Sequence, residues 1–408
     1  MLKRRITRDI VIIGQQPWDT EIGSNCKDIA LEMSKKHRVL YVNSPLDRAT
    51  LLRSRDDEKV QTRIDVLKGR KNGLIRINDN LWNLYPDCMV ESINWININY
   101  IFDSINRTNN KKFAASVQRA LNEIKFNDHI LFNDSEIFKG FYLNELLNPA
   151  LSIYYSRDYM LAVDYWKKNG ERLEPLLISK NDICMANSPY LTDYCKKYNP
   201  NSFYIGQGCD LEMFEEVRDT PADLQGLRHP LIGYVGALQS IRLDMELIAG
   251  IASTRPDWTI VLVGPEDEAF ENSALHQMTN IIFTGPKPLT ELPAYIQAFT
   301  VCINPQLVNE VTIGNYPRKI DEYLAVGKPV VATKTRAMDI FKDHVYLANN
   351  IQEYVEHIKS ALDKDDTMIS NSRREFAKLH TWENSVQEIY KILDTVHSTH
   401  LPFSYDFE

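Results

Sequence analysis

Residues 303–333 read INPQLVNEVTIGNYPRKIDEYLAVGKPVVAT, and this stretch predicts a strand, a helix and a second strand in close succession. An apolar strand ends near Pro305, and after a polar loop Asn315-Tyr316-Pro317 indicates a helix start, with proline near the first helical position. Helical spacing covers 319–326, because Gly327-Lys328-Pro329 stops the helix and begins another buried strand. Such a strand–helix–strand unit is the building block of a parallel α/β sheet.

The same alternation recurs along the chain. Short runs rich in isoleucine, valine and tyrosine that end at glycine, asparagine or proline are typical of parallel strands buried on both faces. They occur at 9–14, 38–43, 129–133, 152–156, 182–187 and 202–206, and again at 231–236, 258–264, 281–285, 301–305 and 329–333. Helical segments between them are expected at 25–35, 93–105, 113–124, 245–254 and 291–298. The pattern predicts an α/β fold of two doubly wound, Rossmann-like domains in tandem.

The domain boundary is expected where the chain becomes polar between the two sets of strands. A length of 408 residues is enough for two or three domains. We predict an N-terminal domain over 1–205, a linker over 206–228, a second domain over 229–378, and a C-terminal helix and tail over 379–408. A helical tail is expected over 370–396, where the apolar residues form one stripe, namely Trp382, Val386, Ile389, Tyr390 and Leu393.

Composition excludes several classes of function. The net charge of −8 argues against a general nucleic-acid binder. The six cysteines are scattered without a C-x-x-C pair, so they are expected to be free thiols in a reducing compartment. No run of 18 apolar residues is present, which predicts a cytoplasmic protein. No H-E-x-x-H or H-x-H spacing occurs, and no metal site is expected.

One segment of the first domain is strongly basic. From Arg48 to Arg76 the chain has nine basic and four acidic residues. One interpretation is a solvated surface. The other is a surface for anionic lipid, or for an anionic acceptor of a transferred group, and this pattern leaves both interpretations open.

Motif searches exclude two common uses of such folds. The dinucleotide fingerprint G-x-G-x-x-G is absent after the first strands of both domains, which argues against a nicotinamide enzyme. The P-loop pattern G-x-x-x-x-G-K-[ST] is also absent, which argues against a P-loop ATPase.

The helix predicted after Asn315 carries residues suited to a nucleotide. Gly314 and Asn315 lie where backbone amides at a helix start meet a phosphate. Lys319 and Glu322 are three residues apart and share one helix face, a cation for a phosphate and a carboxylate for ribose hydroxyls. As an isolated pattern, these two residues are equally consistent with a surface ion pair.

The block P-x-K-x-x-E-Y-L-A-x-G-K-P-V-V-A-T resembles the donor-site helix of the retaining glycosyltransferases of family 4, also called group 1. Gly233-Tyr234-Val235-Gly236-Ala237-Leu238 resembles the first strand and loop of the C-terminal domain in that family. The resemblance implies the GT-B fold, with a cleft between two Rossmann-like domains and a C-terminal helix that returns to the N-terminal domain. Within that family, the chain resembles the bacterial enzymes of surface polysaccharide and teichuronic acid biosynthesis.

The resemblance also implies roles for single residues. Glu322 corresponds to the second glutamate of the E-x7-E motif, which holds the donor ribose, whereas Gly314 stands in place of the first glutamate. Ala237 stands where the family has an arginine, and Arg242 is expected to supply the charge for the diphosphate together with Lys319. Asp158 stands in place of the sugar-side histidine, and Gly23, favoured over Gly14, lies in the loop before the first helix. Backbone near Gly285 and Lys287 is expected to hold the base.

These residues imply a glycosyltransferase that moves a sugar from a UDP- or GDP-sugar to a glycan acceptor, expected to be lipid-linked, with retention and without a cofactor. Asp158, Arg242 and Lys319 are the expected catalytic residues. The expected location is the cytoplasm, at the inner face of the membrane. Two alternatives stay open: a sugar-nucleotide epimerase, and a non-catalytic GT-B protein that binds glycan or a partner enzyme.

Overall fold

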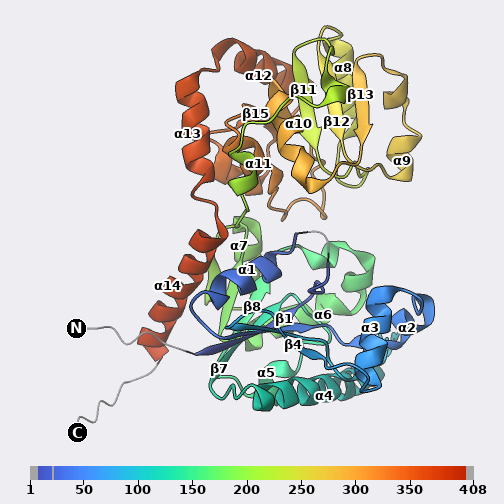
Figure 1. The fold of residues 1–408 in the computed structure, drawn as a ribbon, viewed down its shortest axis with the longest axis vertical. Coiled ribbons are helices and arrows are strands. Elements are labelled where there is room, and N and C mark those ends of the chain that lie inside the picture. The colour runs from blue at the N-terminus through green and yellow to red at the C-terminus, as the bar shows by residue number, and fades with distance from the viewer. Residues whose placement is uncertain (1–7, 21–22, 401–408) are drawn as a thin grey trace. The chain divides into compact units, whose positions relative to one another are not determined.

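The computed structural model describes residues 8–20 and 23–400, with side chains up to Val396. The chain forms two compact units (Figure 1). Unit 1 runs up to Asn187, includes Leu191–Ile205, and takes the last helix from Val386 onward. Unit 2 comprises Ser188–Tyr190 and Gly206–Ser385, so the predicted linker is part of this unit.

Unit 1 is built on an eight-stranded sheet in the order β10-β9-β8-β7-β1-β2-β5-β4. Adjacent strands are parallel except β4 and β5, which are antiparallel. The strands are β1 (Asp9–Gly14), β2 (Val39–Asn43), β4 (Leu74–Arg76), β5 (Leu81–Leu84), β7 (His129–Asp134), β8 (Leu151–Ser156), β9 (Ile183–Ala186) and β10 (Ser202–Tyr204). A separate pair is formed by β3 (Leu46–Asp47) and β6 (Met89–Val90).

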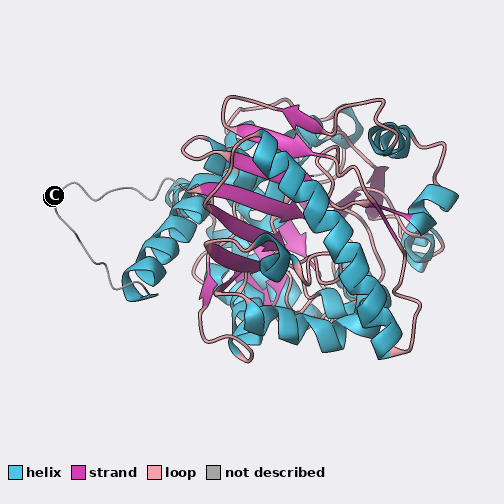
Figure 2. Cartoon of the chain, turned by 90° about the horizontal axis from the view of Figure 1, so that it is seen from below, coloured by secondary structure: helices cyan, strands magenta, loops and turns pink. Residues whose placement is uncertain are grey.

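Helices cover the sheet of unit 1, as Figure 2 shows with strands in magenta and helices in cyan. They are α1 (Asn25–Ser34), α2 (Arg48–Arg53), α3 (Glu58–Leu67), α4 (Asn99–Glu123), α5 (Leu143–Leu147), α6 (Asp164–Lys180) and α7 (Pro189–Lys196). Val11 and Ile13 of β1 pack with Phe113 and Val117 of α4 in one buried cluster. Alternate side chains of a strand point to opposite faces, so apolar residues along β1 serve the cores on both faces of the sheet.

Unit 2 has a six-stranded parallel sheet in the order β13-β12-β11-β14-β15-β16. Its strands are β11 (Leu231–Val235), β12 (Thr259–Val263), β13 (Ile281–Gly285), β14 (Val301–Asn304), β15 (Val330–Thr333) and β16 (Tyr346–Ala348). Its helices are α8 (Met245–Thr254), α9 (Glu268–Glu271), α10 (Leu292–Ala298), α11 (Lys319–Ala325), α12 (Ile351–Lys364) and α13 (Thr367–Ala377), and α14 (Trp382–His400) begins in it. Val235 packs in a cluster with α10 and α11, whereas Ile232 and Tyr234 pack with α8 and α12.

Each sheet has one point at which the strand order reverses. In unit 1 the chain runs from β1 to β2 on one side and returns to β7 on the other. In unit 2 it runs from β11 to β12 and returns to β14. Open α/β sheets bind their ligands beside the carboxyl ends of the strands at such a switch point. The ends of β1 and β7, and those of β11 and β14, are therefore the places to look for a site.

The α/β prediction is confirmed, and each of the eleven predicted strands is present in these two sheets. The helix predictions were less accurate. The segments predicted at 93–105 and 113–124 belong to one helix, α4, which begins only at Asn99. The helical tail is split into α13 and α14. Among the described residues, no helix combines the length and the hydropathy that a bilayer crossing requires.

Candidate functional site

Two glycines shape the carboxyl end of β11 in unit 2. Gly236 follows the strand with a φ of +139°, and its amide donates to the carbonyl of Val263 over 2.9 Å. Gly264, after β12, lies so close that a Cβ there would be 2.1 Å from the Gly236 carbonyl oxygen. A Cβ on Gly236 would lie 2.9 Å from the Lys319 ammonium nitrogen. Glycine at position 236 therefore leaves room for the Lys319 side chain, which comes from the helix between β14 and β15.

Lys319 is the first residue of α11 and reaches back to this strand end. Its Nζ donates a 2.5 Å hydrogen bond to the hydroxyl of Tyr234 and lies 4.1 Å from the centroid of that ring. The Tyr234 hydroxyl in turn donates to the carbonyl of Ala237 over 3.4 Å. The ammonium group is thus fixed beside the switch point of the sheet by a hydrogen bond and a cation–π contact.

Glu322 lies one turn further along α11. Within the described part of the chain, its half-buried carboxylate accepts no hydrogen bond and does not pair with Lys319. Burial raises the pKa of Glu322 above its usual value, against the opposing charges of Arg318 and Lys319. A half-buried carboxylate without an internal donor is available to accept hydrogen bonds from a ligand. The ion-pair interpretation of Lys319 and Glu322 is therefore not supported.

The predicted helix start at Gly314 and Asn315 was wrong. Helix α11 begins at Lys319 with Arg318 at the N-cap. The Asn309 side chain accepts from the amides of Val311 and Thr312, and this turn continues until the Asn315 amide donates to the carbonyl of Thr312 over 3.0 Å. That amide is already used, so the predicted phosphate contact from the Asn315 backbone is not available in this structure.

Arg242 and Lys287 occupy different surroundings. Arg242 is half-buried in the loop after β11, and its carbonyl accepts from the amide of Leu307, just beyond β14. This hydrogen bond places Arg242 at the same switch point as Lys319. The Lys287 ammonium instead forms a 2.8 Å ion pair with Asp223, which raises its pKa. The neighbouring Gly285 has a φ of +69° at the end of β13, and a Cβ there would meet only open space.

Sequence reasoning missed the buried residues of α11 that attach this helix to the rest of unit 2. Asp321 is fully buried, and its carboxylate lies 2.6 Å from the His380 ring and accepts from the Cys209 thiol over 3.4 Å. The Tyr323 hydroxyl accepts from the amide of Val235 over 2.8 Å. The burial of Asp321 could have been inferred from the sequence, because Asp321 lies next to Ile320 on the side of the predicted helix that is buried.

In unit 1, a buried ion pair joins the ends of β7 and β8. The Arg157 guanidinium bonds the fully buried Asp134 through Nε over 2.8 Å and the Asp158 carboxylate through Nη1 over 3.0 Å. Its Nη2 donates to the Gln15 side chain, which follows β1, over 2.7 Å. Asp158, with 41% of its side chain exposed, is thus oriented at the switch point of unit 1. Sequence reasoning identified Asp158 and missed Asp134 and Arg157, although each is a charged residue at a strand end.

The backbone at this point is strained. Ser135 directly follows β7 and has a φ of +51°, which non-glycine residues seldom adopt, and its hydroxyl donates to the Tyr155 carbonyl over 2.8 Å. Strained backbone of this kind gathers at functional sites. The observation supports the β1–β7 edge as the candidate site of unit 1.

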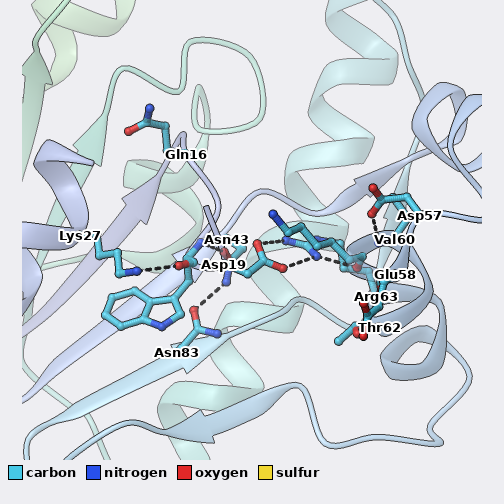
Figure 3. A network of polar contacts seen from close by, with 12 residues as sticks. Gln16, Asp19, Lys27, Asn43, Asp57, Glu58, Val60, Thr62, Arg63 and Asn83 are labelled. Atoms are coloured by element: carbon cyan, nitrogen blue, oxygen red, sulfur yellow. Dashed lines mark hydrogen bonds and ion pairs between the residues drawn. The ribbon is translucent and has the colours of Figure 1, made fainter. Parts of the chain in front are cut away.

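A polar network holds the loop after β1 (Figure 3). The Trp18 amide donates to the Asn43 side chain over 2.7 Å, and Lys27 donates to the Trp18 carbonyl over 3.1 Å. Arg63 of α3 holds both oxygens of Asp19, at 2.8 and 2.9 Å. The loop borders a cavity of about 260 Å³, lined by Gln15, Pro17, Asp19, Ser44, Pro45, Leu46, Asp47, Thr50, Lys59, Val60, Arg63 and Lys139. Gln15 lines this cavity and also accepts from Arg157, so the cavity lies next to the group formed by Arg157, Asp134 and Asp158, here called the Arg157 cluster. Gly23, which the sequence analysis assigned to the loop before the first helix, is exposed just before α1.

A second cavity, of about 470 Å³, lies in unit 2 beside Ala325 and Val326, at the opposite end of α11 from Lys319. No group of three His, Cys, Asp or Glu side chains suited to a metal is present among the described residues. The candidate site of unit 2 thus offers the Lys319 ammonium and the Glu322 carboxylate, with the backbone of Arg242 at the same edge of the sheet.

The chain is similar to known proteins in both sequence and fold. Residues 229–364 match the family model described as glycosyl transferases group 1. The Bacillus subtilis (strain 168) protein TuaH, whose name describes a teichuronic acid biosynthesis glycosyltransferase, is 29% identical over 252 residues, or 57% of this chain. The match spans 61% of the length of that relative.

Solved structures extend the likeness to nearly the whole chain. Sucrose-phosphate synthase from Thermosynechococcus elongatus has a TM-score of 0.68 at 14% identity, over 96% of this chain and 100% of the other. Anabaena HepE in complex with UDP has a TM-score of 0.65 at 16% identity, over 95% and 100%. The starch synthase IV catalytic domain from Arabidopsis thaliana, bound to ADP and acarbose, has a TM-score of 0.60 at 11% identity, over 96% and 99%. The chain therefore has the GT-B fold, and its residues 229–364 match the model of the group 1 glycosyl transferases.

Proposed function

We propose that the protein is a glycosyltransferase that transfers a sugar from a nucleotide-sugar donor to a glycan acceptor. One observation carries the proposal: a fixed lysine ammonium and an unsatisfied carboxylate, Lys319 and Glu322, lie at the switch point of the domain that matches the group 1 family. The similar HepE structure contains UDP, which supports a nucleotide-sugar donor.

In this proposal unit 2 binds the donor. Lys319 and Arg242 stabilise negative charge on the leaving diphosphate, and Glu322 accepts hydrogen bonds from the ribose hydroxyls. Backbone near Gly285 holds the base, whereas the Lys287 side chain maintains its ion pair with Asp223. Gly314 borders the donor through the loop before α11.

Unit 1 binds the acceptor. Asp158, oriented by Arg157, contacts the transferred sugar or the acceptor, and Gly23 borders the same edge. Transfer proceeds with retention: the bond from the anomeric carbon to the diphosphate breaks, and a bond to the acceptor oxygen forms on the same face. The acceptor hydroxyl proton passes to an oxygen of the leaving phosphate, so no side chain acts as a strong base.

The name of the TuaH relative, which refers to teichuronic acid biosynthesis, supports a role in bacterial surface polysaccharide synthesis. We further propose that the acceptor is lipid-linked and that transfer takes place at the inner face of the membrane. The basic stretch from Arg48 to Arg76 contributes less to a membrane contact than its composition suggests, because much of its positive charge is paired. Among the described residues, ion pairs to acidic side chains involve Arg48, Arg63, Arg70, Lys71 and Arg76 of this stretch.

A thermal-shift series with UDP, GDP, ADP and CMP tests the donor class. A ligand at about 100 times its dissociation constant stabilises the folded protein by roughly 2.7 kcal/mol. We expect UDP or GDP to raise the melting temperature and CMP to leave it unchanged. No shift with any of the four would contradict a nucleotide-sugar donor.

A further inference from the structure

Helix α11, which carries Lys319 and Glu322, also contains a buried charge that core packing does not require. Asp321 is fully buried, whereas its neighbours Ile320 and Leu324 pack in the apolar core of unit 2. A carboxylate is costly to bury unless it is paired and hydrogen-bonded. An aliphatic side chain would fill the same place without this cost, so a buried pair is weak evidence for a stabilising role. The presence of Asp321 needs a reason other than packing.

His380 makes the shortest contact of the Asp321 carboxylate. Its Nδ1 lies 2.6 Å from Asp321 Oδ1, and since an ionised carboxylate only accepts, this nitrogen carries the proton and donates. The Cys209 thiol donates to Oδ2 over 3.4 Å. The imidazole ring packs edge-on against Phe341 and Phe376, with centroids 5.8 and 4.7 Å away. Packing thus fixes the ring with its donor nitrogen directed at Asp321.

The two partners of Asp321 come from two segments that are joined to each other. The Cys209 amide donates to the His380 carbonyl over 3.0 Å, and Cys209 forms a β-bridge with Thr381. The main part of unit 2 runs from Gly206 to Ser385, so Cys209 lies close to its beginning and His380 close to its end. One carboxylate of α11 therefore attaches the helix to both ends of this part of the chain.

Asp321 and Lys319 project from nearly opposite sides of α11. Successive residues of an α-helix are about 100° apart, so two positions along the helix correspond to about 200°. The Tyr234 hydroxyl holds Lys319 at the strand end, and His380 holds Asp321 on the other side. Because α11 has only seven residues, a displacement at Asp321 moves Lys319 and Glu322 together with it.

We propose that Asp321 and His380 are positioning residues for the nucleotide-sugar donor. Their hydrogen bond fixes α11 so that Lys319 meets the diphosphate while Glu322 meets the ribose. A polar pair suits this role because a hydrogen bond is directional, whereas apolar contacts are not and would let a short helix shift. Asp321 has no exposed surface, so it acts through its neighbours on the helix. The inference rests on the proposed function, since it concerns the affinity for the donor.

The decisive variant is Asp321→Leu/His380→Leu, in which leucine keeps the branching of aspartate. Replacing both partners of a buried pair by apolar residues has little cost in stability, so the thermal transition should stay near that of wild type. Donor affinity should nevertheless fall. We expect the dissociation constant of UDP or GDP, measured by calorimetry below the transition, to rise about tenfold or more, the scale of one lost hydrogen bond to a charged group.

Two further variants separate positioning from stability. His380→Asn should restore affinity close to that of wild type, because the amide nitrogen of asparagine is attached to Cγ, as Nδ1 is, and can donate to Asp321. The control is Ile358→Ala in α12, which removes a buried side chain from the other core cluster of unit 2. It should lower the thermal transition and leave the dissociation constant of the folded protein unchanged.

A dissociation constant in Asp321→Leu/His380→Leu equal to that of wild type would overturn the proposal. An affinity of His380→Asn as low as that of the double variant would also overturn it, because the hydrogen bond would then not be what positions α11. Should the double variant not fold, Asp321→Asn repeats the test, since it keeps the size of the side chain and removes its charge. If wild type bound neither UDP nor GDP, the proposed function would fail, whereas equal binding by wild type and variants contradicts only the positioning role.

Discussion

The ammonium nitrogen of Lys319 lies 4.1 Å from the ring centroid of Tyr234 and donates a hydrogen bond to its hydroxyl, which itself donates to Ala237. One tyrosine in β11 therefore orients both the first residue of α11 and the loop after its own strand. The two elements that border the candidate donor site are joined at this point.

Removal of the Tyr234 hydroxyl separates positioning from packing. Tyr234→Phe retains the ring and its burial but frees the ammonium group from its hydrogen bond. We expect the Michaelis constant for the donor to rise about tenfold or more if the full contribution of a hydrogen bond to a charged group, roughly 1.5–3 kcal/mol, is lost. The variant should remain folded, because the ring and its packing are retained. Tyr346→Phe, in β16, serves as the control. Unchanged donor kinetics in Tyr234→Phe would show that the hydroxyl does not position Lys319.

Glu322→Gln tests the ribose contact. The amide loses the charge-assisted hydrogen bonds, so donor affinity should fall by about tenfold or more, while folding is retained. Because burial raises the pKa of Glu322, the ionised form that accepts from ribose is lost as pH falls through this raised value. Wild-type donor affinity should thus decline on acidification already above pH 4.5, the usual value for glutamate, and Glu322→Gln should lack this decline. Equal affinities and equal pH profiles would exclude the role.

The Arg157 cluster predicts a stability effect in unit 1. Arg157→Met leaves the fully buried Asp134 carboxylate without its partner, and removing one member of a buried pair costs about 3–5 kcal/mol. The measurement is the denaturant midpoint followed by tryptophan fluorescence. Arg48→Met is the matched control, since its pair with Glu91 lies at the surface and should contribute little. Similar midpoints for the two variants would argue against a structural role of the buried pair.

Transfer should need no divalent metal ion. In the proposed mechanism Lys319 and Arg242 supply positive charge, and such charge stabilises a leaving diphosphate without a metal ion. Activity is expected to persist in excess EDTA. Loss of transfer in EDTA, with recovery on addition of magnesium or manganese, would contradict this assignment of Lys319 and Arg242.

Much of the fold was predictable because buried parallel strands have a strong signature. The runs at β1, β11 and β12 are apolar after the first residue of each strand, so they could be recognised without tertiary information. Strand β4, with residues Leu74–Arg76, was missed because it is short, largely exposed and at the sheet edge. The start of α11 was placed too early, since local proline and asparagine signals do not reveal that Asn309 and Thr312 form a turn of their own.

The site was predictable only in part, for a related reason. Lys319 and Glu322 lie three residues apart in the sequence, so their spacing could be read directly. The contact between Tyr234 and Lys319 joins residues 85 positions apart, and that between Asp134 and Arg157 joins strand ends 23 positions apart. Such pairs exist only once the sheets have formed.

The most direct test of the account is transfer itself, measured with the full chain, a series of UDP- and GDP-sugars, and a lipid-linked glycan acceptor. We predict acceptor-dependent release of the nucleoside diphosphate together with a glycosylated product, and a loss of turnover on the order of 100-fold in Lys319→Ala. Conversion of a nucleotide sugar to its epimer without an acceptor, or donor binding without any product, would contradict the account.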